Sequence, residues 1–504
     1  MSGDPGNALL AIACFLAALC LALAPLALVR TLPIQDYPNH LARMHVLASL
    51  PSSAALQRFY EVNWQPVANL AMDLVVPGLA RLMPLEWAGR AFIGAAFALL
   101  AGGSMLLHRA LWRRSSLWPL IAFLFLYDRI LFLGLLNYLF GAGLCLLAFA
   151  IWISVPETRR WALLKILIST AFGVALYFAH LFAFAVYAVL VLGYELGRIV
   201  REPNRGWAAI LRSLAIAAAP GIPPLILFML SPHGEGAWVF ANPSRKLDLI
   251  FTVLDNYNRA FDVASFALLL AAFAVGCWKG LIRIAPAMIA PLAALTAAYL
   301  LMPSMMMTAA NVDRRIPIVL VLALVAASEP TEAMSRAMRQ LIFAGASLLF
   351  VTRMAVIIEH WRHADRIYAA LSPAFELVLP GSRVAVGFPP SAAHLRTGTV
   401  PILHLPTQWV TAKDALVPTL FAAPTQQPVR LAPASQALAD AVRPDFVWDS
   451  LVRGAVLSPE LMAALAQFDY ICLLDHDPFV LARSEGIEAI FEQPRFKLYR
   501  LTRR

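Results

Sequence analysis

Charged residues are scarce in this chain of 504 amino acids. Aspartate, glutamate, lysine and arginine together make up 14% of it, against about 25% in an ordinary soluble domain. Hydrophobic residues make up 61%, and the mean hydropathy is +0.71. A single core cannot hide so much apolar surface. The composition therefore excludes an ordinary soluble globular protein and predicts a polytopic helical membrane protein.

Cysteine is also scarce, and no internal repeat or low-complexity tract is present. The five cysteines are not spaced as a metal site or as a disulfide framework. We therefore assign no residue as a metal ligand from the cysteines, and a disulfide-stabilised scaffold is excluded.

Eleven apolar runs are predicted to cross the membrane. They lie at 8–29, 88–107, 117–134, 138–155, 162–179, 181–197, 208–230, 263–278, 284–302, 316–328 and 340–358. The first run has no basic residues before it, so it is predicted to be a retained span and not a cleaved signal. The stretch from Trp161 to Leu196 has no turn residue. As one helix it would measure about 54 Å, so a break near His180 is predicted.

The net charge of +10 does not indicate nucleic-acid binding, because the basic residues gather in short connections between the apolar runs. Such connections mark the cytoplasmic side of a membrane. We therefore predict a bacterial inner-membrane protein whose N-terminus is cytoplasmic. The first long loop, 30–87, and the chain after His360 are predicted to be periplasmic.

The chain changes character after about residue 360. "SRVAVGFPP", "FDYICLLD" and "FKLYRLTRR" are typical of strands, and "SPELMAALAQ" at 458–467 is typical of a capped helix. The sequence predicts a transmembrane domain at 1–359 and a soluble, periplasmic α/β domain at 360–504.

The first predicted outer loop opens with "IQDYPNHLARMHVL". A helix that begins near Pro38 would place Asp36, His40 and Arg43 on one face. Asp36 could cap this helix, or it could be a carboxylate at the membrane boundary that takes a proton or binds a cation. Further along, Pro-bounded apolar stretches predict helices lying in the membrane interface. Asp73 would be solvated there or would line a pocket.

Other polar residues fall near the same predicted face. Asp128 lies inside an apolar run, where an acid is costly and therefore a functional candidate, and Asn137 lies in the same outer turn. His180 is either a packing residue or part of a site. Arg314 and Arg315 precede Pro317, which can open a helix. Their guanidinium groups fit phosphate oxygens, although they could also anchor lipid headgroups.

The layout resembles type C glycosyltransferases, in particular the protein O-mannosyltransferase and lipid A aminoarabinose transferase groups. The resemblance rests on "IQDYPNHLAR" after the first span, on Asp128 between later spans and on "DRRIP" before a late span. It implies a polyprenyl-phosphate sugar donor and a lipid or glycan acceptor. Asp36 would be the general base, and Arg315, helped by Arg314, would bind the carrier phosphate.

In this resemblance, Asp128 would join Asp36 in catalysis, and His40, Arg43, Asp73, Asn137 and His180 would help to bind substrate. The family usually has two adjacent acids where this chain has Asp36 followed by Tyr37. This departure argues against a metal-dependent version, although a divalent cation stays an open alternative. Two other functions remain open. One is a transporter or flippase of a lipid-linked anion, and the other is an O-antigen-ligase-like polymerase.

Overall fold

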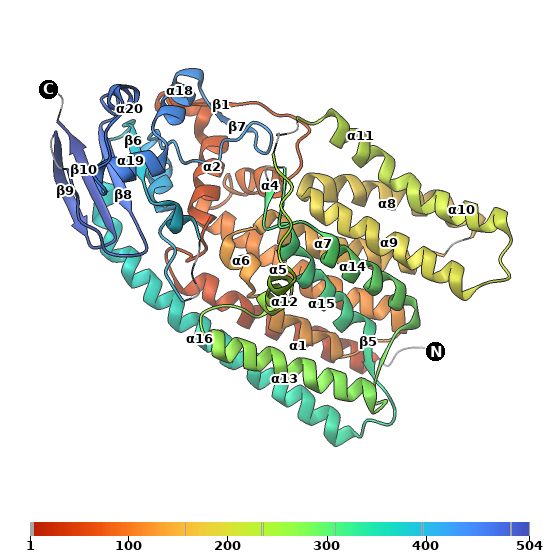
Figure 1. Cartoon of the computed structure of the whole chain (residues 1–504). Helices are drawn as coiled ribbons and strands as arrows, with labels where there is room; N and C mark the ends of the chain where they lie inside the picture. Colours follow the sequence, from red (N-terminus) through yellow and green to blue (C-terminus); the bar gives the residue numbers. More distant parts are fainter. Residues whose placement is uncertain are drawn as a thin grey trace. The chain divides into compact units, whose positions relative to one another are not determined.

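The structure, a computed structural model, describes residues 5–156, 158–232, 234, 236–307, 309–394, 396, 398–483 and 486–502. It divides into two compact units. Unit 1 comprises Met1–Ala27, Pro66–Ala71 and Ala91–Ile358. Unit 2 comprises Leu28–Gln65, Met72–Arg90 and Glu359–Arg504. Figure 1 shows the chain coloured from red at the N-terminus to blue at the C-terminus.

Unit 1 is helical. Its helices are α1 (Pro5–Leu28), α5 (Leu85–Trp112), α6 (Arg129–Leu133), α7 (Leu136–Ser154), α8 (Arg159–Ala179), α9 (Leu181–Arg201), α10 (Trp207–Ala218), α11 (Ile222–Leu230), α12 (Pro243–Ile250), α13 (Arg259–Trp278), α14 (Ile289–Leu301), α15 (Ile316–Ala327) and α16 (Arg336–Glu376). The first turns of α5, up to Arg90, and the last part of α16, from Glu359, are counted in unit 2. Two short antiparallel pairs join β2 (Ile282–Ile284) to β5 (Ser328–Pro330) and β3 (Met305–Met306) to β4 (Ala309–Ala310).

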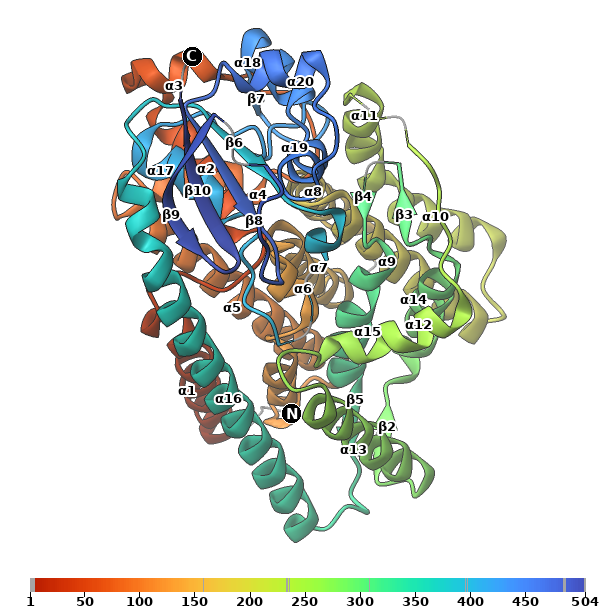
Figure 2. The same ribbon diagram turned by 60° about the vertical axis from the view of Figure 1, so that its left-hand side comes forward.

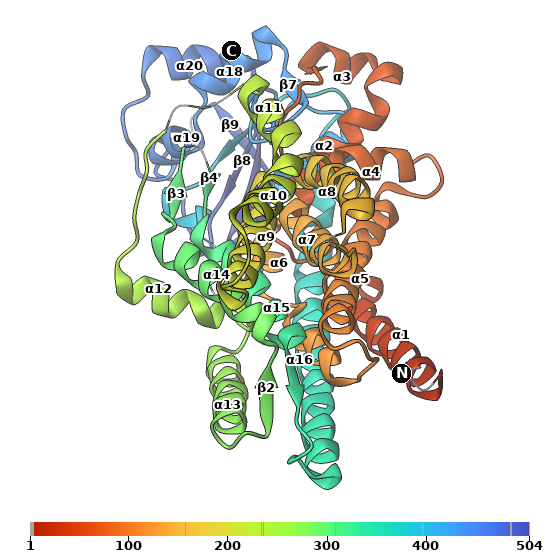
Figure 3. The same ribbon diagram turned by 90° about the vertical axis from the view of Figure 1, so that its right-hand side faces the viewer.

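Within the described part of the chain, eight helices are long and apolar enough to cross a membrane. Seven of them are α1, α5, α7, α8, α9, α13 and α16, and the eighth is formed by α10 and α11 together. The chain is therefore a polytopic helical membrane protein, as predicted. Helix α9 packs against α7, α8 and α14, and Figure 3 shows α14 beside α9.

Two predicted features of the spans are confirmed or changed by the structure. The break near His180 is confirmed, because α8 ends at Ala179 and α9 begins at Leu181. The run 117–134 is not one span. It forms a 3-10 helix, Trp118–Phe125, followed by the short α6, because Asp128 caps a new helix and Gly134, with φ of 90°, ends it.

Two further predicted spans are short helices. The runs 284–302 and 316–328 form α14, of 13 residues, and α15, of 12 residues. The last run extends far beyond its predicted end, since α16 has 41 residues.

Unit 2 combines the first long loop with the C-terminal part of the chain. The loop supplies α2 (Tyr37–Ser49), α3 (Ala54–Phe59), β1 (Tyr60–Val62) and α4 (Ala71–Leu79). The C-terminal part supplies β6 (Val384–Gly387), α17 (Gln408–Lys413), β7 (Val429–Leu431), α18 (Pro433–Ala441), α19 (Pro444–Leu451), α20 (Pro459–Leu465), β8 (Tyr470–Leu474), β9 (Ile487–Gln493) and β10 (Phe496–Leu501).

The strands of unit 2 form a four-stranded sheet in the order β6-β8-β10-β9, which Figure 2 shows beside its helices. β6 and β8 are parallel, and the other pairs are antiparallel. The predicted strands at "SRVAVGFPP", "FDYICLLD" and "FKLYRLTRR" are confirmed. So is the helix after Ser458, whose hydroxyl accepts a hydrogen bond from the amide of Leu461.

The first loop and the C-terminal part share one hydrophobic core. Ala42, Val46 and Leu56 from the loop pack with Trp409 and Val410 from α17 in a single buried cluster. The loop strand β1 also pairs antiparallel with β7, with Tyr60 opposite Leu431. The first loop is thus built into a folded unit, which gives its polar side chains fixed positions.

Candidate functional site

Asp36 stands directly before α2, but its side chain does not cap that helix. Its backbone has φ −88° and ψ −5°, and its carboxylate makes no hydrogen bond to the first turn. A capping residue normally has an extended backbone that places its side chain over the first amides. Pro38 lies in the first turn, as predicted. The capping interpretation is therefore wrong, and the carboxylate is available for other partners.

The partner of Asp36 is His404, a residue of the C-terminal part of the chain. His404 Nε2 lies 3.3 Å from Asp36 Oδ1, and the two side chains are 12% and 18% exposed. On its other side, His404 Nδ1 lies 3.1 Å from Asn39 Nδ2. We call Asp36, Asn39 and His404 the carboxylate cluster.

The hydrogen bonds of Asn39 determine which nitrogen of His404 carries the proton. Asn39 Oδ1 accepts from the amide of Phe421 at 2.6 Å, and Asn39 Nδ2 donates to the carbonyl of Thr419 at 2.8 Å. These two bonds fix the orientation of the amide. Asn39 then donates to His404 Nδ1, so Nε2 is the nitrogen that carries the hydrogen. This nitrogen lies 3.3 Å from one carboxylate oxygen of Asp36.

His40 lies next to the carboxylate cluster. Its ring contacts Phe421 edge-on at 5.7 Å, and the ring of His404 contacts the same phenyl group at 5.0 Å. Phe421 therefore packs between the two imidazoles and shields one side of the carboxylate cluster.

Arg43 and Asp73 form a buried ion pair. Arg43 Nε donates to Asp73 Oδ1 at 2.7 Å, and Nη2 donates to Oδ2 at 2.9 Å. Both side chains are 0% exposed. The pair joins α2 to α4 with the bidentate geometry that arginine favours. These side chains bind one another, and the pair ties α2, which follows Asp36 directly, to α4.

In unit 1, Arg314 and Arg315 lie in a short 3-10 turn, Asp313–Arg315, just before α15. Arg315 is 6% exposed. Its Nη2 donates to the carbonyl of Ala310 at 3.2 Å, and its guanidinium stacks on Phe182 at 4.9 Å. Its Nε and Nη1 have no hydrogen-bond partner among the described residues, and neither has Nε of Arg314.

The acid beside these arginines is occupied elsewhere. Asp313 is fully buried, and its Oδ2 lies 3.2 Å from Lys246 Nζ. Lys246 therefore balances Asp313, and the two guanidiniums keep their positive charge for another acceptor.

More positive charge surrounds Arg314. Burial lowers the pKa of Arg315 to about 10, and burial together with repulsion from Arg129 and Arg245 lowers the pKa of Arg314 to about 10. Arg314 and Arg315 therefore remain cationic at neutral pH. We call Arg129, Arg314 and Arg315 the guanidinium cluster. Arg314 and Arg315, buried cations with unused donors at the start of a helix, are suited to an oxyanion such as a phosphate.

His180 helps to hold Arg315. Its Nδ1 accepts from the amide of Phe182 at 3.1 Å, and its ring packs edge-on against Tyr138 at 5.4 Å. The hydroxyl of Tyr138 donates to the carbonyl of Arg315 at 2.5 Å. The structure thus brings His180 and Arg315 together through Tyr138 and Phe182, which the sequence analysis did not select.

Asp128 caps α6 from the connection between α5 and α7, outside the eight candidate spans. Its Oδ1 accepts from the amide of Leu131 at 2.8 Å, and its Oδ2 has no hydrogen-bond partner among the described residues. The side chain does not pair with Arg129, which lies 4.0 Å from Asp255. Burial raises the pKa of Asp128 to about 8, so the carboxyl is mostly protonated at neutral pH.

Asn137 supports the chain at Asn69. Its Nδ2 donates to the carbonyl and to the side-chain oxygen of Asn69 at 2.7 and 3.0 Å. Asn69 has a positive φ of 82°, and α4 begins only at Ala71. Asn69 therefore lies just before α4, and Asp73 lies in its first turn.

The described residues contain no group of three or more histidine, cysteine, aspartate or glutamate side chains that could hold a metal ion.

No protein-family model and no curated protein sequence matches this chain. Solved structures do match, and two of them are of ArnT. A crystal structure of ArnT from Cupriavidus metallidurans bound to undecaprenyl phosphate has a TM-score of 0.55 and 12% identity, and the match covers 97% of each chain. The same ArnT in the apo state has a TM-score of 0.52 and 14% identity, again over 97% of each chain.

The chain has the fold of ArnT. ArnT is an aminoarabinose transferase of type C, so the resemblance found in the sequence is confirmed for the fold. The similarity to ArnT extends over unit 1 and unit 2 alike, since it covers nearly the whole chain.

Proposed function

We propose that the protein is a membrane glycosyltransferase that moves a sugar from a polyprenyl-phosphate carrier to an acceptor hydroxyl. The observation that carries this proposal is the buried guanidinium of Arg315, whose Nε and Nη1 have no partner among the described residues. In a protein with the ArnT fold, such a group is suited to a carrier phosphate. The similar ArnT was crystallised with undecaprenyl phosphate.

The proposal assigns the reaction to both clusters. The acceptor hydroxyl gives its proton to Asp36, which acts as general base, and its oxygen bonds to the anomeric carbon of the sugar. The bond from that carbon to the phosphate oxygen breaks on the opposite face, with inversion. The electron pair leaves with the carrier phosphate, whose growing charge Arg315 and Arg314 stabilise.

The other residues act through these groups. His404 Nε2 lies 3.3 Å from Oδ1 of Asp36, so the other oxygen, Oδ2, is assigned to accept the proton. Arg43 and Asp73 fix α2. In unit 1, His180 and Tyr138 hold the turn that carries Arg315, and Asp128 caps α6, which begins at Arg129.

The topology completes the proposal. The N-terminus is cytoplasmic, and unit 2 lies on the periplasmic face of a bacterial inner membrane, where the donor enters from the outer leaflet. The acceptor is a lipid or a glycan. This orientation follows from the basic connections on one side of the spans.

The test separates donor binding from sugar transfer. The variants Asp36→Asn and Arg315→Gln are assayed with a polyprenyl-phosphate sugar, with exposed residues as matched controls (Asp440→Asn on α18 and Arg212→Gln on α10). Asp36→Asn should still bind the donor and lose about 10²–10⁴-fold in transfer rate. Arg315→Gln should lose donor affinity as well as rate.

Two outcomes contradict the proposal. If Asp36→Asn transfers as the wild type does while Arg315→Gln is inactive, the protein is of the O-antigen-ligase type. If neither variant nor wild type cleaves the donor but Arg315 is needed for its movement across the bilayer, the protein is a flippase.

A further inference from the structure

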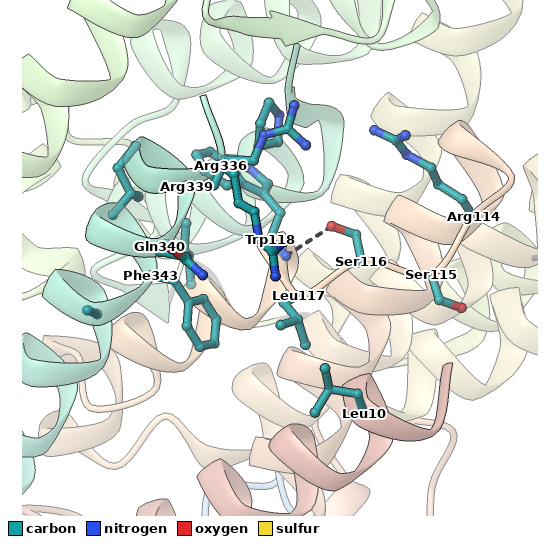
Figure 4. A pocket seen from close by; sticks show the side chains of 14 residues that line it. Leu10, Arg114, Ser115, Ser116, Leu117, Trp118, Arg336, Arg339, Gln340 and Phe343 are labelled. Carbon is teal, nitrogen blue, oxygen red and sulfur yellow. Dashed lines mark hydrogen bonds between the residues drawn. The ribbon is translucent and has the colours of Figure 1, made fainter. Parts of the chain in front are cut away.

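Unit 1 has a cavity of 570 Å³ between the start of α16, the segment after α5, and α1. Figure 4 shows Arg336, Arg339 and Gln340 on α16, Arg114 across from them, and Leu10 of α1 at the lower end. The lining includes no aspartate or glutamate. The cavity therefore combines basic groups with the surface of two membrane-spanning helices.

The arginines of this cavity are not equally neutralised. Arg114 pairs with the buried Glu329, which also binds Arg283 at 3.2 Å. Arg339 donates only to backbone carbonyls, at 3.1 and 2.6 Å. Arg336 is exposed, and its side chain has neither a hydrogen-bond acceptor nor an acidic partner among the described residues. The positive charges of Arg336 and Arg339 therefore have no acidic partner among the described residues.

An apolar groove continues the cavity. A second hollow of 210 Å³ shares Ile121 and Phe343 with the first, and its other lining is almost wholly apolar, from α1, the 3-10 helix after α5, and α16. Along α16 the lining passes from Arg336 through Phe343 to Phe350. Phe350 lies fourteen positions after Arg336, so the two are about 21 Å apart along the helix axis. This is more than half of the roughly 30 Å hydrocarbon core of a bilayer.

We propose that the cavity and groove together, which we call the α16 groove, bind one anionic glycerophospholipid. Its phosphate lies against Arg336 and Arg339, where Gln340 can also donate, and one acyl chain follows Phe343 toward Phe350. Basic recesses between spanning helices select anionic headgroups. A zwitterionic lipid would bring its own cation toward the two unbalanced arginines, so the charge favours an anionic headgroup.

The test is a titration of the detergent-purified full chain with phosphatidylglycerol or phosphatidylcholine, followed by native mass spectrometry. Wild type should prefer phosphatidylglycerol. Arg336→Gln should weaken phosphatidylglycerol binding about fivefold and leave phosphatidylcholine binding unchanged. The matched control is Arg212→Gln, which removes an exposed arginine outside the groove and should bind as wild type.

A second variant tests the acyl part. Ala346→Phe fills the apolar groove and should reduce the binding of phosphatidylglycerol, whereas Leu348→Phe, at a 69% exposed position of the same helix, should not. Equal affinity of wild type for the two lipids, or equal losses in Arg336→Gln and Arg212→Gln, would overturn the proposal. Both results are independent of sugar transfer.

Discussion

The ion pair of Arg43 and Asp73 offers a test of how Asp36 is held. Arg43 Nε and Nη2 bind Asp73 at 2.7 and 2.9 Å, and neither side chain is exposed. Arg43→Met would leave the carboxylate of Asp73 buried without its cation. Breaking a buried pair from one side costs about 3–5 kcal/mol. For a domain of 150–250 residues this corresponds to about 6–20 °C in Tm, at about 2–4 °C per kcal/mol.

The double variant Arg43→Met/Asp73→Leu removes both charges at once. Replacing a whole buried pair by apolar side chains is often neutral or stabilising, so most of the lost Tm should return. The assay is thermal unfolding in detergent, with donor turnover measured on the same samples. Turnover should recover together with Tm if the pair acts only by fixing α2, as proposed.

Additive losses in the double variant would refute this reasoning, since they would mean that each residue binds something other than its partner. A single variant with wild-type Tm would refute it as well.

Three further predictions concern the two clusters and Asp128. His404→Ala should lower kcat about 10–100-fold with little change in KM, because Asp36 loses the polar N–H group that lies 3.3 Å from its charged form. His404→Gln, which keeps an N–H donor, should restore part of the rate, and His394→Ala, at an exposed position, should leave it unchanged. Equal effects of Ala and Gln would argue against a positioning role of this group. Asp128→Asn should gain stability relative to wild type as the pH rises. In the folded protein the carboxyl of Asp128 keeps its proton up to about pH 8, whereas an unfolded aspartate loses it near pH 4. The stability of the wild type therefore falls as the pH rises from about 4 to about 8. A difference in Tm between variant and wild type that does not change with pH would contradict this. The contribution of Arg315 to the binding of polyprenyl phosphate should stay constant between about pH 6.5 and 8.5, because the pKa of Arg315 is about 10. Arg315→Lys should bind polyprenyl phosphate more weakly, since lysine lacks the forked pair of donors of a guanidinium. Unchanged affinity in Arg315→Lys would show that only the charge matters.

Local signals in the sequence predicted much of the helical frame. Pro38 marked the start of α2, His180 marked the break between α8 and α9, and Ser458 marked the start of α20. Each of these signals acts within a few residues of the backbone, so it can be seen in the chain itself. The same local reasoning failed at Asp128, where a side-chain cap divides a run that hydropathy alone treats as one span.

The partners of the candidate residues could not be predicted in this way. His404 lies 365 positions after Asn39, and no motif around it connects it with Asp36. The joint core of the first loop and the C-terminal part likewise depends on side chains such as Ala42 and Trp409 meeting in space. Asp73 and Arg43 looked like separate polar candidates in the sequence because their bond exists only in the folded unit.

The central claim is that Asp36 starts the cleavage of a sugar from a polyprenyl-phosphate carrier. Native mass spectrometry of the protein incubated with such a sugar lipid tests it most directly, by the ratio of intact donor to free polyprenyl phosphate on the protein. The account predicts free polyprenyl phosphate on wild type once an acceptor is present, and intact donor on Asp36→Asn. The same ratio on both proteins, or no isoprenoid phosphate on either, would contradict it.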